Sequence, residues 1–462
     1  MSVLTVSSGQ CGNQLGAALY EKIYGELGGS EGQSPEMDYF FRSGIQNPDK
    51  YVPRAVCIDT EPKVIREVVH SPKLGQWKYD PNSAAYRHGG AGNNWSLGYQ
   101  MCSGEFLEEI LDKVRRELEF CDISPAIVNM HSLAGGTGSG LGAGITEEIA
   151  DIHGHLARLN IVIAPYHFGE VVVQNYNAVL SLSRVSEASH GVLVFENEAA
   201  HDLSKHMRGI EQPRIRDLND TIATSIVPLL LPKVTGTIGE GGEGSSRRRR
   251  PAVRLRDDLS HLACHPSYRF LEAKVTPCTP AKSIDFTFDS WPSVLNTLYQ
   301  MQFTGATTER GLARHFESIK SSGRGQMKTV ASVLTLHGTD AEDATLNMAP
   351  KSPLCEVPRD WDENGEREGD MPPLYSDTVH PSGESVRVDY SHHRANGYDH
   401  SGVLFSNSQA ILPVLQRVNT KAIELFKAGA YLHQYEAHGV TKDDFRASFL
   451  DVGQVIQDYR AL

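Results

Sequence analysis

The chain has 462 residues, which is enough for two or three domains and a large hydrophobic core. Hydrophobic residues make up 40% and charged residues 22%, an ordinary globular composition. The net charge of -13 argues against general nucleic-acid binding, and no apolar run approaches the roughly 18 residues of a membrane-spanning helix. The seven cysteines include no CxxC pair, so they favour neither a disulfide framework nor a zinc ribbon. Because no secretory signal is visible either, we expect a protein of the reducing cytoplasm, without nucleic-acid or membrane partners.

Strand-like and helix-like segments alternate through the first part of the chain. The clearest helix is predicted over Gly104–Cys121, where apolar residues recur at helical spacing. Strands are predicted at Val3–Val6, Ala55–Asp59, Ala126–Met130, Asn160–Ala164 and Gly191–Phe195. This alternation predicts an α/β fold with a mostly parallel sheet covered by helices on both faces. In such sheets, ligands bind beyond the carboxyl ends of the strands.

The rest of the chain is less regular. Two segments are predicted as surface loops, namely 235–256, which contains the four arginines Arg247–Arg250, and the polar stretch 339–382. An alternative role for the arginines is nuclear import or the binding of an acidic partner. The strands predicted here are Arg269–Val275, Lys328–Leu336, Ser385–Tyr390 and Val403–Ser406. The helices predicted here are Asn219–Leu231, Ala410–Phe426 and Lys442–Tyr459.

A glycine-rich loop joins a predicted strand to a helix-compatible run over Leu141–Leu156. Its residues are Ala134, Gly135, Gly136, Thr137, Gly138, Ser139 and Gly140. Glycines let the backbone turn tightly and approach a ligand. The first N–H groups of the following helix are unpaired and, with the helix dipole, favour an anion such as phosphate. The alternative is a glycine-rich turn that binds nothing.

Two further loops have the same character. Gly9-Gln10-Cys11-Gly12-Asn13-Gln14 follows the first predicted strand, and Gly89–Asn94 is a third loop rich in glycine and asparagine. Since the first and the glycine-rich loops both follow strands of one predicted sheet, the three together could surround a polyphosphate with neutral amide groups. No Gly-Lys pair occurs, so the lysine-containing P-loop is excluded.

Without a P-loop lysine, the phosphate charge needs another counter-ion, and magnesium is the natural choice. Asp59 and Glu61 lie at the end of a predicted strand, where residues two apart point the same way. The alternative is an ordinary acidic strand end.

Two other patterns carry weaker alternatives. Gly138–Ala143 fits the GxGxxA dinucleotide fingerprint, but the next predicted strand ends in Pro165 and Tyr166 rather than in an acidic residue, and Glu170 comes too late. A nicotinamide-dependent oxidoreductase is therefore disfavoured. Asp151, His153 and His155 could suggest a metal site, but residues two apart do not share a helix face, so we expect solvent-exposed histidines.

These segments resemble the tubulin family. The similar segments run in the family order through Gly9–Gln14, Asp59–Pro62, Gly92–Trp95, Ala134–Gly140 and Asn175–Asn177. Delta-type tubulins are the most similar members, on the segments Gly75–Tyr79, Gly169–Asn177, Ser406–Gln409 and Ala430–Tyr435. The resemblance implies a Rossmann-type GTP-binding domain over 1–206, an α+β intermediate domain over 207–408 and a C-terminal helical region over 409–462.

The resemblance also implies roles for individual residues. It places Gly9, Gln10, Cys11 and Gln14 at the nucleotide, Glu61 at magnesium, and Asn93 at the γ-phosphate. Ser132 and Ala134–Gly140 would hold the phosphates, and Asn219 would read the guanine edge. Asp257 would act in trans on the GTP of a neighbouring subunit; the alternative is an exposed surface aspartate.

Three positions depart from the family pattern. The asparagine that usually assists Asn219 aligns with Met207, the aromatic residue that stacks on the base aligns with Ile215, and the acidic residue near the ribose aligns with Gln174. We therefore expect GTP affinity or guanine preference to be weaker than in alpha and beta chains.

The implied function is that of a GTP-binding cytoskeletal protein with, at most, a slow GTPase activity coupled to assembly. Its location would be the centriole or basal body, where it would support triplet microtubules and cilium assembly. Its partners would be alpha-, beta- and epsilon-type tubulins and centriolar proteins. The alternative within the same fold is a nucleotide-dependent regulator that does not polymerise.

Overall fold

The computed structural model describes most of the chain, and its backbone divides into two compact units. The described residues are 2–28, 36–44, 50–70, 77–121, 125–169, 171–235, 255–278, 290–309, 312, 327–349, 352, 354, 374–376, 385–392, 394–395 and 398–462. Unit 1 comprises Met1–Ala200, Arg214–Val227 and Leu412–Asp458. Unit 2 comprises His201–Pro213, Pro228–Ile411 and Tyr459–Leu462. The three-domain division at residues 206 and 408 stays a prediction.

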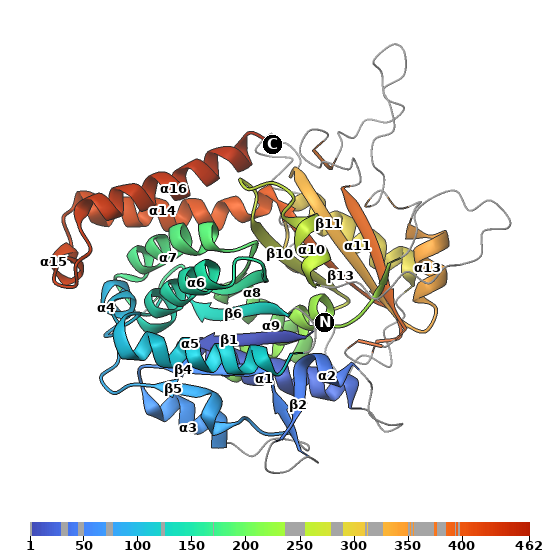
Figure 1. Ribbon diagram of the computed structural model, residues 1–462. Coiled ribbons are helices and arrows are strands. Elements are labelled where there is room, and N and C mark those ends of the chain that lie inside the picture. The colour runs from blue at the N-terminus through green and yellow to red at the C-terminus, as the bar shows by residue number, and fades with distance from the viewer. Residues whose placement is uncertain are drawn as a thin grey trace. The chain divides into compact units, whose positions relative to one another are not determined.

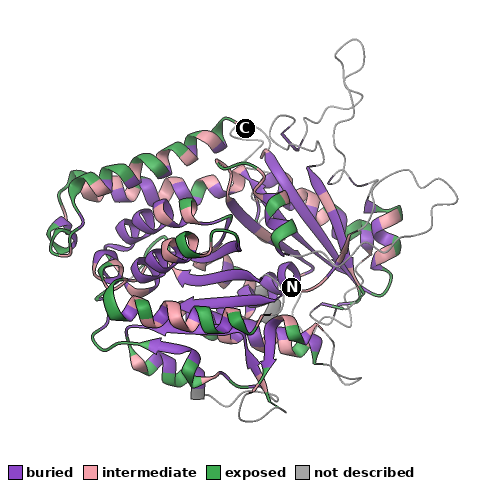
Figure 2. Cartoon of the chain, viewed as in Figure 1, coloured by how far each residue is buried: buried purple, intermediate pink, exposed green. Residues whose placement is uncertain are grey.

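Unit 1 is built on a parallel sheet (Figure 1). Its strands, in spatial order, are β5 (Ala84–Tyr86), β4 (Ala55–Asp59), β1 (Val3–Ser8), β6 (Ala126–Ser132), β7 (Ala157–Ala164) and β8 (Gly191–Glu196). Each neighbouring pair is parallel, and the strands are buried nearly along their whole length (Figure 2). The α/β class and the predicted strands of this part are therefore confirmed.

Helices cover both faces of this sheet. The even-numbered positions Leu4 and Val6 of β1 pack against α5 (Gly104–Glu119) and α6 (Gly142–Ile152). The odd-numbered positions face α1 (Gly9–Leu27), because the Thr5 hydroxyl lies 3.1 Å from the Tyr20 hydroxyl. This two-sided burial follows from the alternation of side chains along a strand. The remaining helices that begin in the first 200 residues are α2 (Met37–Phe40), α3 (Pro62–His70), α4 (Trp95–Gln100), α7 (Gln174–Ala188) and α8 (Asn197–Arg208).

Helices from later in the chain complete unit 1. They are α9 (Ile215–Leu230), whose last three residues belong to unit 2, α14 (Leu412–Lys427), α15 (Leu432–Glu436) and α16 (Lys442–Arg460). The rings of Phe426 and Phe449 lie 5.3 Å apart and join α14 to α16. No described helix is both long and apolar enough to cross a membrane.

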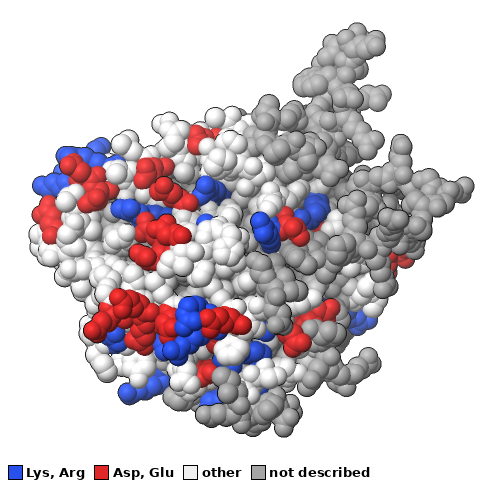
Figure 3. Space-filling model, viewed as in Figure 1, with Lys and Arg blue, Asp and Glu red and all other residues white. Residues whose placement is uncertain are grey.

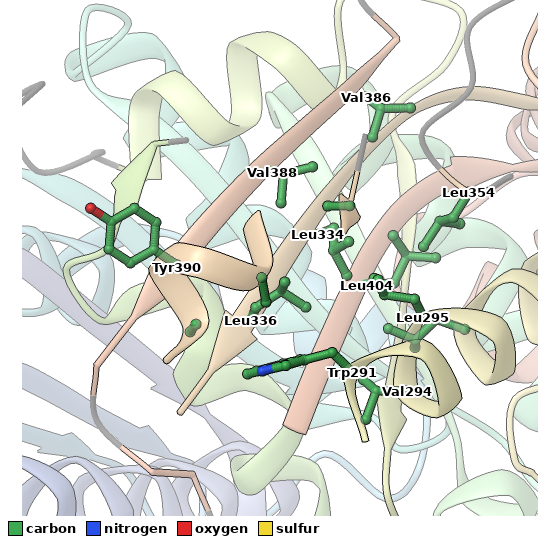
Figure 4. Close-up of a cluster of buried hydrophobic side chains, with 14 of the residues drawn as sticks. Trp291, Val294, Leu295, Leu334, Leu336, Leu354, Val386, Val388, Tyr390 and Leu404 are labelled. Carbon is green, nitrogen blue, oxygen red and sulfur yellow. The ribbon is translucent and has the colours of Figure 1, made fainter. Parts of the chain in front are cut away.

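Unit 2 contains a mixed sheet. Its strands, in spatial order, are β10 (Phe270–Thr276), β13 (Ser401–Ser408), β11 (Thr329–His337), β12 (Val386–Ser391) and β9 (Val234–Thr235). Only the pair β11 and β12 is parallel among these described strands. Its helices are α10 (Leu255–Leu262), α11 (Trp291–Thr304) and α13 (Ala341–Asn347). In the core, Trp291 and Leu295 of α11 lie against Leu336 and Leu404 of the sheet (Figure 4).

Three predicted segments need correction. The helix predicted over 141–156 begins earlier, as a π-helical turn η2 (Thr137–Leu141), and α6 ends at Ile152. The predicted loop 235–256 is shorter at both ends, because Thr235 pairs in β9 and Leu255 begins α10. Within 339–382, Ala341–Asn347 is helical, and Leu354, Leu374 and Tyr375 are buried in the core. Arg247–Arg250 lie outside the described residues.

Candidate functional site

Three loops of unit 1 meet at the carboxyl edge of its sheet. Because β1, β4 and β6 are parallel neighbours, the residues that follow them lie at the same edge. Gly9 has a φ of +73°, and a Cβ there would lie only 2.9 Å from the backbone nitrogen of Gly138. The hydroxyls of Thr60 and Thr137 are 2.6 Å apart. The structure thus brings together loops that are far apart in the sequence: Thr60 and Thr137 are 77 positions apart, and Gly9 and Gly138 more than a hundred.

The glycines of the Ala134–Gly140 loop are explained mainly by packing against protein. A Cβ at Gly136 would lie 2.6 Å from the carbonyl oxygen of Ala91, and one at Gly140 would lie 2.1 Å from that of Trp95. The Ser139 hydroxyl is buried and donates to the carbonyl of Gly135. By contrast, a Cβ at Gly135 would have only the Asn93 side chain within 4 Å, at 3.8 Å. Close approach to a ligand therefore explains Gly135 better than the other glycines of the loop.

The start of α1 offers unpaired amide groups. Its N-cap residue Ser8 makes no side-chain capping bond, and the first turn contains no acidic residue. Gln10 is exposed, while Cys11 and Gln14 are half-buried. Burial raises the pKa of the Cys11 thiol to about 12, so the thiol stays neutral near pH 7 and is a poor nucleophile. The free N–H groups favour an anion here.

A buried asparagine fixes the start of α1, a role that the sequence did not indicate. The Asn13 amide nitrogen donates to the carbonyl of Gly9 at 2.9 Å and to that of Ile58 at 2.8 Å. These two bonds tie the first loop to the end of β4. An asparagine inside a helix, one turn after a glycine, is the only local signal that could have indicated this role.

The third loop ends in two asparagines with different tasks. Asn93 has a φ of +54° and is exposed, whereas Asn94 is buried and caps α4 by accepting from the Ser96 N–H at 2.9 Å. The backbone carbonyl of Asn93 accepts a 2.8 Å hydrogen bond from the side chain of Asn177. Asn177 donates equally to the carbonyl of Ala134 at 2.8 Å, so it joins the third loop to the glycine-rich loop. This positioning role is one that the sequence did not indicate.

The acidic end of β4 could hold a metal ion. Asp59 accepts from the Glu61 N–H at 3.1 Å, while its second oxygen is buried and has no hydrogen-bond partner among the described residues. Burial raises the pKa of Asp59 to about 6. Glu61 is exposed, and its carboxylate lies near Gly90. The strand ends at Asp59, so the alternation that was expected to align the two carboxylates does not reach Glu61.

The donor set fits magnesium, although through two differently placed carboxylates. A hard cation that keeps several water ligands needs few protein oxygens. The segments 9–14, 59–61, 89–94 and 132–140 contain no lysine or arginine. Phosphate charge at this edge would therefore be balanced by amide groups and a cation rather than by a basic side chain.

The residues assigned to the base and ribose show a different pattern. Asn219 is buried in α9, whereas Ile215 at the start of that helix is 64% exposed. The Gln174 side chain is buried, and its amide nitrogen donates to the carbonyl of Tyr166 at 2.8 Å, a bond within the protein rather than to a ligand. Neither Ile215 nor Gln174 supplies a stacking face or a carboxylate.

Position 207 does not belong to this edge of the sheet. Asn197 begins α8 directly after β8, and Met207 follows ten residues later (197 to 207), which is about 15 Å along a helix. The backbone at position 207 therefore lies away from the carboxyl edge, contrary to the alignment that placed it beside Asn219. By contrast, Asn197 is half-buried and directly follows β8, so it lies at the carboxyl edge.

A further polar cluster follows β7 and β8, farther along the same carboxyl edge of the sheet. His167, Glu196 and Glu198 offer ligand atoms within 4.8 Å of one another, but Arg417 already pairs with Glu196 at 2.8 Å. This arrangement is an ion-pair network in which no metal is needed.

The predicted exposure of the Asp151, His153 and His155 group is only partly correct. Asp151 and His155 are exposed, whereas His153 is half-buried just beyond the end of α6.

Asp257 lies in unit 2, in the first turn of α10, and its side chain is exposed. Its neighbour Asp258 is buried and pairs with Lys233 at 3.1 Å. The structure thus distinguishes two adjacent aspartates that the sequence presents as equivalent.

A parallel sheet with glycine-bearing loops and an uncapped helix start at its carboxyl edge defines an α/β protein of the nucleotide-binding class. Residues 2–205 match the "Tubulin/FtsZ family, GTPase domain". The chain is 30% identical to the Homo sapiens "Tubulin delta chain", over 99% of each protein. Its identity to the Mus musculus "Tubulin delta chain" is also 30%, over the whole of both. A Candida albicans "Tubulin beta chain" is 26% identical, over 99% of this chain and 94% of the relative. The chain belongs to the tubulin family.

Proposed function

We propose that the carboxyl edge of unit 1 binds the phosphates of GTP. The observation that carries this proposal is the meeting of Gly9, Thr60 and the 134–140 loop beside the uncapped start of α1. The N–H groups there favour phosphate. GTP is the nucleotide that the matching GTPase domain implies.

The test is to purify the full chain and identify any nucleotide that is released on denaturation. Guanine nucleotide at near one equivalent supports the proposal, and its exchange should require magnesium. Extracted NAD or NADP, or failure to bind added GTP, would overturn it. Glu61→Gln should weaken the magnesium dependence of exchange, because it removes an exposed charge next to Gly90.

On the base side, we propose that Asn219 reads guanine with the help of Asn197. An asparagine amide both donates and accepts, which suits the guanine edge. With no aromatic side chain at position 215 and no carboxylate at position 174, affinity should be weaker than in alpha and beta chains. Equal GTP affinity, together with strong exclusion of ATP, would contradict this.

The cellular role follows from the resemblance to delta-type tubulins. We propose that the protein acts with alpha-, beta- and epsilon-type tubulins at centrioles and basal bodies, in triplet microtubule formation and cilium assembly. A tagged chain should localise there and co-sediment with assembled tubulin. Absence from both would favour a nucleotide-dependent regulator that does not polymerise.

A further inference from the structure

A segment near the end of the chain contacts the phosphate loops directly. Tyr435, in α15, is fully buried, and its hydroxyl donates to the side-chain oxygen of Asn177 at 2.6 Å. The contact joins residues separated by 258 positions. Residues 2–205 account for the GTPase domain, so Tyr435 lies well outside the part of the chain that the family match assigns to nucleotide.

The Asn177 amide has no spare hydrogen-bonding capacity. Its nitrogen donates to the carbonyls of Asn93 and Ala134, both at 2.8 Å, and its oxygen accepts from the N–H of Trp95 at 3.0 Å and from Tyr435. An asparagine side chain has two N–H donors and two lone pairs, so all four are used. Burial raises the pKa of the Tyr435 hydroxyl, which therefore stays protonated and can only serve Asn177 as a donor.

Tyr435 itself is held rigidly. Its ring contacts those of Tyr176 at 5.6 Å and Phe445 at 5.2 Å, so packing fixes the direction of the hydroxyl. A second bond runs in parallel, from the Asn94 side chain to the carbonyl of Gln434 at 3.0 Å. Gln434 and Tyr435, adjacent residues of α15, thus hold Asn94 of the third loop and Asn177, which joins that loop to the glycine-rich loop.

We propose that Tyr435 is a positioning residue of the GTP phosphate site. By orienting the Asn177 amide, it fixes the backbones of Asn93 and Ala134, between which the γ-phosphate would lie. This inference rests on the proposed function, which places the γ-phosphate beside Asn93. Because linkage is reciprocal, binding of the γ-phosphate would in turn stabilise α15.

The test compares Tyr435→Phe with Tyr20→Phe in the full chain. Tyr20 is also fully buried, and its hydroxyl donates to the carbonyl of Arg54 at 2.7 Å, away from the phosphate loops. Each variant removes one buried tyrosine hydroxyl, so each should lower stability to a similar extent. We expect Tyr435→Phe to lower the ratio of GTP to GDP affinity about threefold to tenfold, and Tyr20→Phe to leave that ratio unchanged.

The outcomes separate this inference from the proposed function. Suppose that Tyr435→Phe keeps the wild-type ratio of GTP to GDP affinity while Asn93→Ala lowers it. The positioning role of Tyr435 is then wrong, but the proposed GTP site is still supported. If wild-type protein binds no guanine nucleotide, both the proposed function and the positioning role are overturned. Hydrogen exchange on the wild-type chain gives a second reading that needs no variant to fold: the amides of 432–437 should exchange more slowly with GTP than with GDP, and equal exchange overturns the role.

Discussion

At the scale of single residues, glycine has two distinct uses in α1. Gly9 has a left-handed φ and no room for a Cβ, whereas Gly25, within the same helix, has nothing within 4 Å of that position. We predict that Gly9→Ala lowers GTP affinity at least tenfold, because the strain and the contact with Gly138 shift the phosphate loop. Gly25→Ala should leave binding unchanged and raise stability by about 0.5–1 kcal/mol. Isothermal titration and thermal unfolding measure both, and equal binding losses would refute the distinction.

A buried histidine beneath the phosphate loop should make stability depend on pH. His131 is 1% exposed, and burial lowers its pKa from 6.5 to about 4. Between these two pKa values, His131 is protonated in the unfolded chain but neutral in the folded protein. The stability present above pH 6.5 is therefore lost as the pH falls towards 4. Between pH 7 and 5 this amounts to about 2 kcal/mol. Denaturant unfolding at both pH values should show the loss in wild type and in the exposed control His155→Gln, but not in His131→Gln.

At the scale of elements, the sequence predicts buried strands well where apolar residues run together. It underestimates β13, which was predicted over four residues and spans Ser401–Ser408. The reason is chemical: the missed residues Asn407 and Ser408 are polar but buried, and their side chains donate to the carbonyl of Leu262 at 2.9 Å and to Glu272 of β10 at 2.6 Å. Such partners come from distant parts of the chain, so local hydrophobicity cannot reveal them. The same holds for Asn177, whose role depends on three separate loops.

A buried ion cluster in unit 2 ties α10 to β12 and to Lys233, which directly precedes β9. Lys233 pairs with Asp258 at 3.1 Å and with Asp389 at 3.5 Å, and Arg387 contacts both aspartates. Removing one member of a buried pair leaves the other charge uncompensated, so Lys233→Met should cost about 3–5 kcal/mol of unfolding free energy. The matched control is Asp257→Asn, beside Asp258 but exposed, which should change stability by less than about 0.5 kcal/mol. Equal effects in chemical denaturation would contradict the burial difference.

At the scale of the whole molecule, the family and the α/β class follow from sequence, because the glycine loops keep their order along the chain. On the face shown in Figure 3, acidic and basic side chains lie next to one another in separate clusters on a largely uncharged surface. On α5, for example, Asp112 pairs with Arg115 and Arg116. On this face, the described charged side chains therefore do not gather into one acidic patch. The residues expected to contact the base were harder to predict. Alignment to the family placed position 207 at the carboxyl edge of the sheet, but α8 runs away from that edge before it reaches residue 207.

We expect any GTP hydrolysis to depend on a neighbouring subunit rather than on the single chain, and Asp257 provides the test. None of the phosphate-loop segments contains a basic side chain, and the carboxylate that resembles the family's catalytic group lies in the other unit, exposed at the start of α10. An exposed carboxylate there can orient or deprotonate water on a neighbour's nucleotide, a contribution of about 10²- to 10⁴-fold. We predict that Asp257→Ala leaves GTP affinity and stability of the isolated chain unchanged, and lowers only the turnover stimulated by added alpha- and beta-tubulin. Phosphate release, measured with and without those partners, checks this. Unchanged stimulated turnover would remove Asp257 from the mechanism, and reduced GTP binding by the isolated chain would assign it a structural role instead.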